Sequence, residues 1–336
     1  MRRTARWAAR LTVTFLILGL LAALGCATGP SGEPDGSGTP IDVTPAAIKI
    51  GTLATQDALP LWVAEAAGYF EEQGIPSVEI ITFQSATECQ TAFTSGAVDA
   101  LMTDIIVAAN LQASGTPVQL ATVMLGSEAA EGRFAVVAAP GSSVASMGDL
   151  RGVAVGTASA TITEYILDKL MEEAGYSAAD VKREEVGKMP VRFQLLMEGQ
   201  LKAAVLPEPF VTLAEQGGAA IVAGGDDTKA KQNVSQSVLC ISAEYAETRE
   251  GAAAVKAVLA AWDLAVADIN AAPDDFRQVL VDKARLPEPL AGTYKVSTYP
   301  MAAPPTSDEI QTVLDWMTAK GYLKAEPKPA EMLGAN

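Results

Sequence analysis

The chain has 336 residues, a formal net charge of −16 at pH 7 and no histidine. Such an excess of acid argues against nucleic acid as a partner, because a polyanion would be repelled. The three cysteines are too few for a disulfide scaffold and lack the spacing of a metal site, so we expect neither a metal nor another cofactor. Cys89 and Cys240 are expected to be two buried thiols rather than a disulfide.

The N-terminal segment has the pattern of an export signal. Its first ten residues carry four arginines and no acid, and the uncharged stretch LTVTFLILGLLAALG that follows is short for a membrane-spanning helix. Residues 1–25 are therefore predicted to be a signal peptide. Ala23-Leu24-Gly25-Cys26 resembles the bacterial lipobox, which implies a lipid on Cys26; the alternative is a cleaved signal that leaves a free thiol. Residues 26–46 are rich in Gly, Pro, Ser and Thr and predict a flexible, lipid-anchored linker.

From Ile48 onward, strand-like and helix-like segments alternate, which predicts parallel sheets covered by helices. The first lobe is expected to contain strands at residues 48–53, 78–83, 98–103 and 118–124. A second lobe follows with strands at residues 133–137, 153–156, 181–186, 203–206 and 219–223. The chain then returns near Gln236, and a final helix is predicted to be capped by Thr306 and Glu309.

These patterns divide the chain into two lobes. Lobe 1 is assigned to residues 47–131 and 236–325, lobe 2 to residues 132–235, and a C-terminal tail to residues 326–336. The crossings between the lobes are expected near Arg133 and Gln236, where the alternation of strands and helices is interrupted.

Three strings resemble a known family. They are LPLWVAEAAGYFEEQGI, GDLRGVAVGTASATITEYILDKLMEEAGY and AAVLPEPFVTLAEQGG, and they are similar to the NMT1/THI5-like (SsuA/TauA-like) solute-binding proteins of sulfonate, nitrate, taurine and thiamine-pyrimidine ABC importers. The resemblance implies an α/β type II periplasmic-binding-protein fold, with two α/β lobes joined by two hinge strands and a solute in the cleft between them. It also implies an extracytoplasmic location, an ABC permease and its ATPase as partners, and we expect a monomer.

Candidate ligand-binding residues follow the predicted strands, because ligands in open α/β sheets bind beyond the carboxyl ends of the strands. In the first lobe, Thr55, Gln56 and Asp57 form either a solute-binding loop or an ordinary polar turn. Trp62 either stacks on a planar ligand or packs in the core. Asp104 either binds ligand, as the family often does at this point, or caps the next helix.

Further candidates lie at helix starts in both lobes. Ser85 and Glu88 cap their own helix, and the helix NH groups beside them are expected to face the cleft. In the second lobe, Ser159 and Thr161 precede a helix. Glu208 lies between two prolines and resembles the family's EP motif; its alternative role is that of a first-turn acid favoured by the helix dipole.

The charges predicted near the cleft bear on the ligand. Lys188 and Arg192 are the only bases near it, and a surface position is expected for both, whereas several carboxylates lie beside it. A neutral or weakly basic nitrogen heterocycle, such as a pyrimidine or flavin-like vitamin or its precursor, is therefore favoured over sulfonate, taurine or nitrate. A pyrimidine-synthase-like enzyme is disfavoured because that branch of the family relies on histidine, which this chain lacks. Whether the protein serves import or sensing stays open.

Overall fold

The computed structural model divides the chain into two units, residues 1–42 and 43–336. The described residues all belong to the second unit and comprise 43–126, 131–224, 237–284, 290, 292–323 and 327–333. The predicted signal peptide, Cys26, most of the linker and the return crossing at Gln236 lie outside the described residues.

The first sheet has the strand order β2-β1-β3-β10-β4. Its strands are β1 (Ile48–Leu53), β2 (Val78–Phe83), β3 (Ala100–Thr103), β4 (Val118–Leu125) and β10 (Ser237–Ser242). β1 pairs in parallel with β2 and β3, as the alternating pattern predicts. β10, however, is antiparallel to both of its neighbours, because the chain re-enters the sheet from the opposite direction after building the second one.

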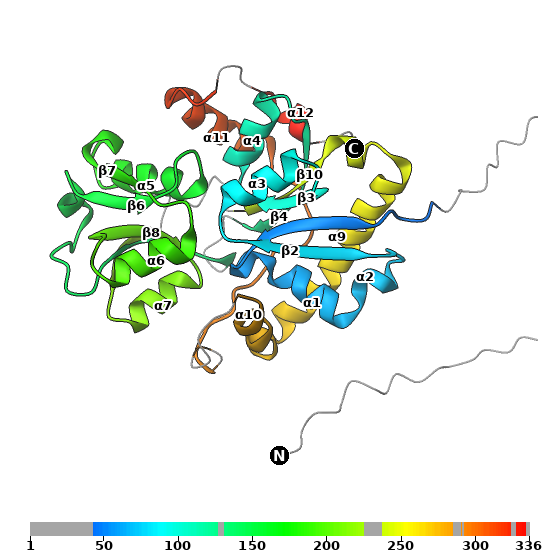
Figure 1. Cartoon of the computed structure of the whole chain (residues 1–336), viewed down its shortest axis with the longest axis horizontal. Coiled ribbons are helices and arrows are strands. Elements are labelled where there is room, and N and C mark those ends of the chain that lie inside the picture. The colour runs from blue at the N-terminus through cyan, green and yellow to red at the C-terminus, as the bar shows by residue number, and fades with distance from the viewer. Residues whose placement is uncertain are drawn as a thin grey trace, which may run out of the picture. The chain divides into compact units, whose positions relative to one another are not determined.

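Helices cover both faces of this sheet (Figure 1). Alternate residues of β3 show the two faces: Leu101 packs in the cluster that contains residues of α3, α4 and α11, whereas Ala100 and Met102 pack against α1, α9 and α10. The helices are η1 (Gln56–Ala58), α1 (Leu59–Ala67), α2 (Tyr69–Glu72), α3 (Ala86–Thr94), α4 (Ile105–Ala113), α8 (Ala243–Ala246), α9 (Arg249–Ala271), η6 (Pro273–Phe276), α10 (Arg277–Ala284), α11 (Ser307–Ala319) and α12 (Pro329–Met332).

The second sheet repeats the plan, with the order β7-β6-β8-β5-β9. β6 is parallel to β7 and β8, and β5, the first strand after the crossing, is antiparallel to β8 and β9. Both sheets are therefore mixed rather than wholly parallel. The elements are β5 (Phe134–Ala138), η3 (Met147–Leu150), β6 (Ala154–Thr157), α5 (Ile162–Glu173), η4 (Ala178–Asp180), β7 (Lys182–Glu185), α6 (Met189–Met197), β8 (Ala203–Pro207), α7 (Phe210–Gln216) and β9 (Ala220–Gly224).

We call the first sheet with its helices the first lobe, and the second sheet with its helices the second lobe. One buried cluster contains residues of both: Ile106 of α4, Val136 of β5, Ile166 of α5 and Trp316 of α11. The second-lobe helix α5 is therefore packed into the same apolar core as α11 of the first lobe.

Among the described residues, no helix combines the length and apolar character needed to cross a bilayer.

A buried polar cluster joins the end of α11 to α5. Lys320 Nζ lies 2.7 Å from Glu164 Oε1 and 3.0 Å from Asp168 Oδ2, and Trp316 Nε1 donates a hydrogen bond of 3.1 Å to the same Asp168 oxygen. Both carboxylates are almost completely buried. Buried carboxylates need such partners, because an unpaired charge in the interior is costly.

Candidate functional site

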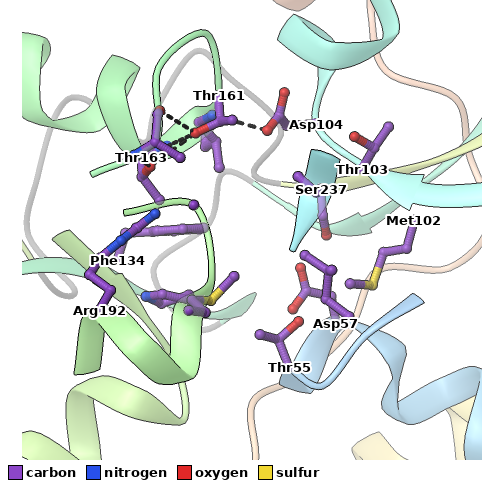
Figure 2. A pocket seen from close by; sticks show the side chains of 17 residues that line it. Thr55, Asp57, Met102, Thr103, Asp104, Phe134, Thr161, Thr163, Arg192 and Ser237 are labelled. Carbon is purple, nitrogen blue, oxygen red and sulfur yellow. Dashed lines mark hydrogen bonds between the residues drawn. The ribbon is translucent and has the colours of Figure 1, made fainter. Parts of the chain in front are cut away.

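A cavity lies between the two lobes, at the ends of their central strands (Figure 2). Its volume is about 570 Å³, including the part open to solvent. The residues that line it are Leu53, Thr55, Asp57, Ala86, Met102, Thr103, Asp104 and Ser237 from the first lobe, and Phe134, Ala158, Thr161, Ile162, Thr163, Gly187, Met189, Arg192 and Pro207 from the second.

Topology explains the position of this cavity. Leu53 ends β1, Thr103 ends β3 and Pro207 ends β8, and each of these residues lines the cavity. The carboxyl ends of neighbouring parallel strands meet at one edge of a sheet, and the loops that leave them carry the polar side chains. Both lobes contribute such an edge, so the cavity receives polar groups from two sides.

Asp57 belongs to the 3-10 turn η1 and contributes a buried carboxyl group to the first-lobe side. Only 7 % of the residue is exposed, and burial raises its pKa, while the nearby hydroxyls of Thr55 and Ser237 oppose the rise. In Figure 2, Thr55, Asp57 and Ser237 lie together on this wall. The group can accept hydrogen bonds when ionised and can also donate one when protonated.

Asp104 contacts both lobes. Its Oδ1 accepts a hydrogen bond of 2.9 Å from Val107 N and so caps α4, while its Oδ2 accepts one of 3.0 Å from Ile162 N at the start of α5. Burial raises its pKa from 3.8 to about 6, against the lowering effect of these backbone donors. The expected capping role of Asp104 is thus present, together with a position on the cavity wall.

Thr161 lines the cavity at the N-terminus of α5. Its hydroxyl accepts from Thr163 N at 3.3 Å, which caps the helix, and donates to Ala158 O at 2.8 Å. Thr163 also lines the cavity, and its hydroxyl accepts hydrogen bonds from the Thr157 hydroxyl and from Ala158 N. These internal bonds fix the loop before α5 in one conformation.

Arg192 is the residue that the sequence reasoning placed wrongly. Instead of lying on the surface it is 1 % exposed, and its side chain lines the second-lobe wall opposite Asp57 (Figure 2). Nε donates to Val186 O at 2.9 Å and Nη1 to Val205 O at 3.0 Å, whereas Nη2 has no hydrogen-bond partner among the described residues. Burial lowers its pKa to about 10, so the group remains a cation at neutral pH.

No carboxylate of the described part of the chain forms a salt bridge with Arg192. A buried cation in this state favours an external anionic or accepting group. The sequence contained one signal for the position of Arg192: it lies four residues before Leu196, which puts both on the same face of a helix. In the structure these two are the buried residues of α6.

Comparison with known proteins places the chain in a family. The model of the NMT1/THI5-like family matches residues 55–275. The chain belongs to the NMT1/THI5-like family. No curated protein matches it.

Solved structures similar to this NMT1/THI5-like protein share its fold. The periplasmic aliphatic sulfonate-binding protein SsuA from Escherichia coli is 19% identical, with a TM-score of 0.70 over 87% of this chain and 92% of that one. The alkanesulfonate-binding SsuA from Xanthomonas axonopodis pv. citri, bound to MOPS, is 18% identical, with a TM-score of 0.71 over 85% and 96%. The nitrate-binding NrtA from Synechocystis PCC 6803 is 15% identical, with a TM-score of 0.64 over 84% and 83%. The expected periplasmic-binding-protein fold is confirmed.

Four of the predicted ligand residues in the first lobe of the NMT1/THI5-like protein lie outside the cavity lining: Gln56, Trp62, Ser85 and Glu88. Gln56 is turned away from it: its Oε1 accepts a hydrogen bond of 2.7 Å from the Tyr294 hydroxyl, so this side chain supports η1 from behind. Trp62 is 1 % exposed and packs in the core between α1 and α9, as its alternative interpretation expects. Ser85 accepts from Glu88 N and caps α3.

Three predicted residues, Glu88 among them, are engaged with other partners. Glu88 lies at the rim, where its carboxylate is 2.7 Å from Lys188 Nζ of the second lobe. Ser159 donates its hydroxyl hydrogen to Glu185 Oε2 at 2.6 Å. Glu208 is paired with Arg133 Nε at 2.5 Å and accepts from the Thr212 hydroxyl at 3.0 Å.

Sequence reasoning also missed two hydroxyls on the first-lobe wall, those of Thr103 and Ser237. Thr103 Oγ1 is buried without a hydrogen-bond partner among the described residues, and Ser237 Oγ accepts from Leu125 N at 3.1 Å. Thr103 could have been found from its place at the end of a strand, beside Asp104. Ser237 could not, because β10 joins the first sheet only in the tertiary structure.

Proposed function

We propose that this protein is a lipid-anchored, extracytoplasmic solute-binding protein that captures a small molecule between its lobes and delivers it to an ABC importer. The observation that carries the proposal is the convergence of opposite charges on one cavity: Arg192 from the second lobe and the carboxyl groups of Asp57 and Asp104 from the first. Membership of the NMT1/THI5-like family and the solute-binding roles of its structural neighbours support it.

The solute in this proposal carries an accepting group at one end and N–H groups at the other. The accepting end meets Arg192, and the N–H groups meet the Asp57 carboxyl group and neighbouring hydroxyls. A pyrimidine-like nitrogen heterocycle with a ring carbonyl and N–H groups has this character. The apolar side chains of Met102, Phe134 and Met189, which also line the cavity, suit a flat ring.

An amino-substituted sulfonate such as taurine is the second candidate, and Arg192 is the observation that favours it. The expectation that the cleft lacks a buried base is wrong, so the reason for preferring a heterocycle over a sulfonate is weaker than the sequence suggested. The two SsuA neighbours are described as sulfonate-binding. A zwitterion would place its sulfonate at Arg192 and its ammonium group near Asp57.

The ligand contacts in the proposal are drawn from both predicted and newly found residues. They are Thr55, Asp57, Asp104 and Thr161, with Thr103, Arg192 and Ser237 added. Gln56 and Ser85 support the elements that carry these groups, while Glu88 and Lys188 form an ion pair across the rim.

A thermal-shift screen of the mature chain tests the solute. The panel contains pyrimidines, flavins, taurine, alkylsulfonates and nitrate, and a solute that binds only the folded state raises the melting temperature. A shift by pyrimidines supports the heterocycle, and a shift by taurine supports the zwitterion. If no member shifts the wild type, the binding proposal fails for these classes. Mass spectrometry of the recovered solute checks that it is bound and not converted, as expected for a binding protein rather than an enzyme.

The anchor is tested by replacing the cysteine. Cys26→Ser is expected to move the protein from the membrane fraction to the soluble fraction and to abolish labelling by radioactive palmitate. Cys89→Ala is the matched control, because Cys89 is a buried thiol in the core and burial raises its pKa to about 12. Membrane association that survives Cys26→Ser would contradict the lipid anchor.

A further inference from the structure

The N-terminus of α5 opens onto the ligand cavity. Ile162 and Thr163, its first two residues, line the cavity, and the helix runs for 12 residues. A helix N-terminus carries a partial positive charge and unpaired N–H groups, which attract anions.

Every N–H group of this first turn is already bonded within the chain. Thr163 N donates to Thr161 Oγ1 at 3.3 Å and Glu164 N to Thr161 O at 3.1 Å. Ile162 N donates across the cleft to Asp104 Oδ2 at 3.0 Å. Asp104 thus occupies the position from which an anion would otherwise bind the helix.

The Asp104 carboxylate bonds two helices at once, because its other oxygen caps α4. Only 5 % of Asp104 is exposed, so its charge is poorly screened by water. An oxyanion brought to the start of α5 would displace this carboxylate from Ile162 N or lie against it as a like charge. The unused donors of the cavity lie elsewhere on its wall: Arg192 Nη2, Thr103 Oγ1 and Thr55 Oγ1 have no partner among the described residues.

We propose that Asp104 is a specificity-determining residue, whose carboxylate fills the anion position at the α5 N-terminus and thereby excludes simple oxyanions from the cavity. This inference rests on the proposed solute-binding function. If Asp104 acts in this way, the accepting group of the solute can bind only on the second-lobe side of the cavity, at Arg192. Nitrate, sulfate and methanesulfonate, which have no N–H group to offer the carboxylates, are rejected. A solute that carries both an accepting group and N–H groups is admitted.

Two substitutions test this role while retaining the α4 cap. Asp104→Asn and Asp104→Ser keep a residue that is favoured at helix N-caps. Asparagine retains one accepting oxygen, and its amide nitrogen cannot accept from Ile162 N. Serine keeps an accepting oxygen on a shorter side chain. Both variants release the Ile162 N–H group and remove the negative charge, and circular dichroism checks that they are folded.

The matched control is Glu88→Gln. Glu88 also contacts the second lobe, through its ion pair with Lys188, but it lies outside the cavity lining. This variant loosens a contact between the lobes without freeing a helix N–H group in the cavity. An effect that comes only from easier opening of the cleft would therefore appear in Glu88→Gln as well.

The measurement is titration calorimetry at pH 8 with nitrate and with methanesulfonate, at constant ionic strength. A regained hydrogen bond to a charged group predicts affinity about tenfold or more above that of the wild type in both Asp104 variants. No gain in either folded variant, an equal gain in Glu88→Gln, or tight nitrate binding by the wild type would overturn the inference.

The wild type supplies an independent readout if neither variant folds. Lowering the pH from 8 to 5 protonates Asp104, so nitrate is expected to bind more tightly at pH 5. The other ionisable groups that line the cavity in the described part of the chain are Asp57 and Arg192; nitrate titration of Asp57→Asn at both pH values separates the contribution of Asp57. Absence of any gain at pH 5 would contradict the proposed role.

The two levels of proposal fail differently. If the wild type binds a heterocycle or taurine while the Asp104 variants gain no affinity for anions, the inference about Asp104 fails and the solute-binding function stands. If no solute in the screen binds the wild type, the proposed function fails, whatever the variants do with nitrate.

Discussion

Among the described residues, Arg192 is the only cation that lines the cavity, and its replacement by lysine tests what its side chain contributes. Lysine keeps the positive charge but carries a single nitrogen, whereas the guanidinium group holds Val186 O through Nε and Val205 O through Nη1 and still has Nη2 to offer. An ammonium group cannot reproduce this fork. The variant therefore separates the charge of Arg192 from its geometry.

The structure gives the size of the expected effects. A hydrogen bond from a charged donor contributes about 1.5–3 kcal/mol, so loss of the one to the solute is expected to weaken binding about 10- to 100-fold. At least one of the two carbonyl oxygens, that of the buried Val205 or that of the half-buried Val186, also loses its donor, which is expected to lower the free energy of unfolding by about 1–3 kcal/mol. Arg192→Met should weaken binding further, because it removes the charge as well.

The assay pairs titration calorimetry with urea denaturation, using the solute that gives the largest thermal shift in the screen. Lys188→Met is the matched control, since Lys188 is a neighbouring base with an exposed side chain, and its ion pair is screened by solvent and contributes little to stability. Unchanged affinity in both Arg192 variants, or an equal loss in Lys188→Met, would refute the assignment of Arg192 to the ligand.

Three further predictions concern stability. Lys320→Met leaves the buried carboxylates Glu164 and Asp168 with Arg183 as their remaining partner cation and is expected to lower the free energy of unfolding by about 1–3 kcal/mol in urea denaturation; a change below about 1 kcal/mol would contradict a stabilising role. The folded state holds the Asp104 proton more tightly than the unfolded state, since burial raises the pKa from 3.8 to about 6, so stability should fall as pH rises from about 4 to 6. Asp104 contributes at most about 3 kcal/mol of this fall, and Asp104→Asn should remove that part, while the part due to Asp57, whose pKa burial also raises, remains. A pH profile that is the same in the variant and the wild type would refute the contribution of Asp104. Trp62→Phe should lower the melting temperature without changing solute affinity, because Trp62 packs in the core. A loss of affinity with an unchanged melting temperature would show instead that Trp62 contacts the solute.

Sequence patterns predict the local parts of this fold well. The caps at Ser85 and Thr161 and the capping box of Thr306 with Glu309 are present as expected. Capping depends on residues within one turn of each other, so the sequence contains all of its partners. The periodic apolar residues that predict strands 48–53 and 78–83 are equally local, and both strands are found with those bounds.

The site depends on partners that are distant in sequence. Asp104 meets Ile162, and Glu208 meets Arg133 instead of the ligand. Both residues follow strands as predicted, but their neighbours are set by the way the second lobe packs against the first. The antiparallel placement of β5 and β10 has the same origin, because it requires the chain to leave one sheet and re-enter it.

The sequence by itself determined the class of fold, the helix starts and which loops reach the sheet edges, since these follow from short-range periodicity and capping. Only the tertiary structure decided which polar groups line the cavity. Arg192 is charged in either setting, yet whether it is a surface base or a buried donor depends on two carbonyl oxygens brought to it by other segments, Val186 and Val205. Burial and hydrogen-bond partners are properties of the packed molecule, and they change the expected ligand.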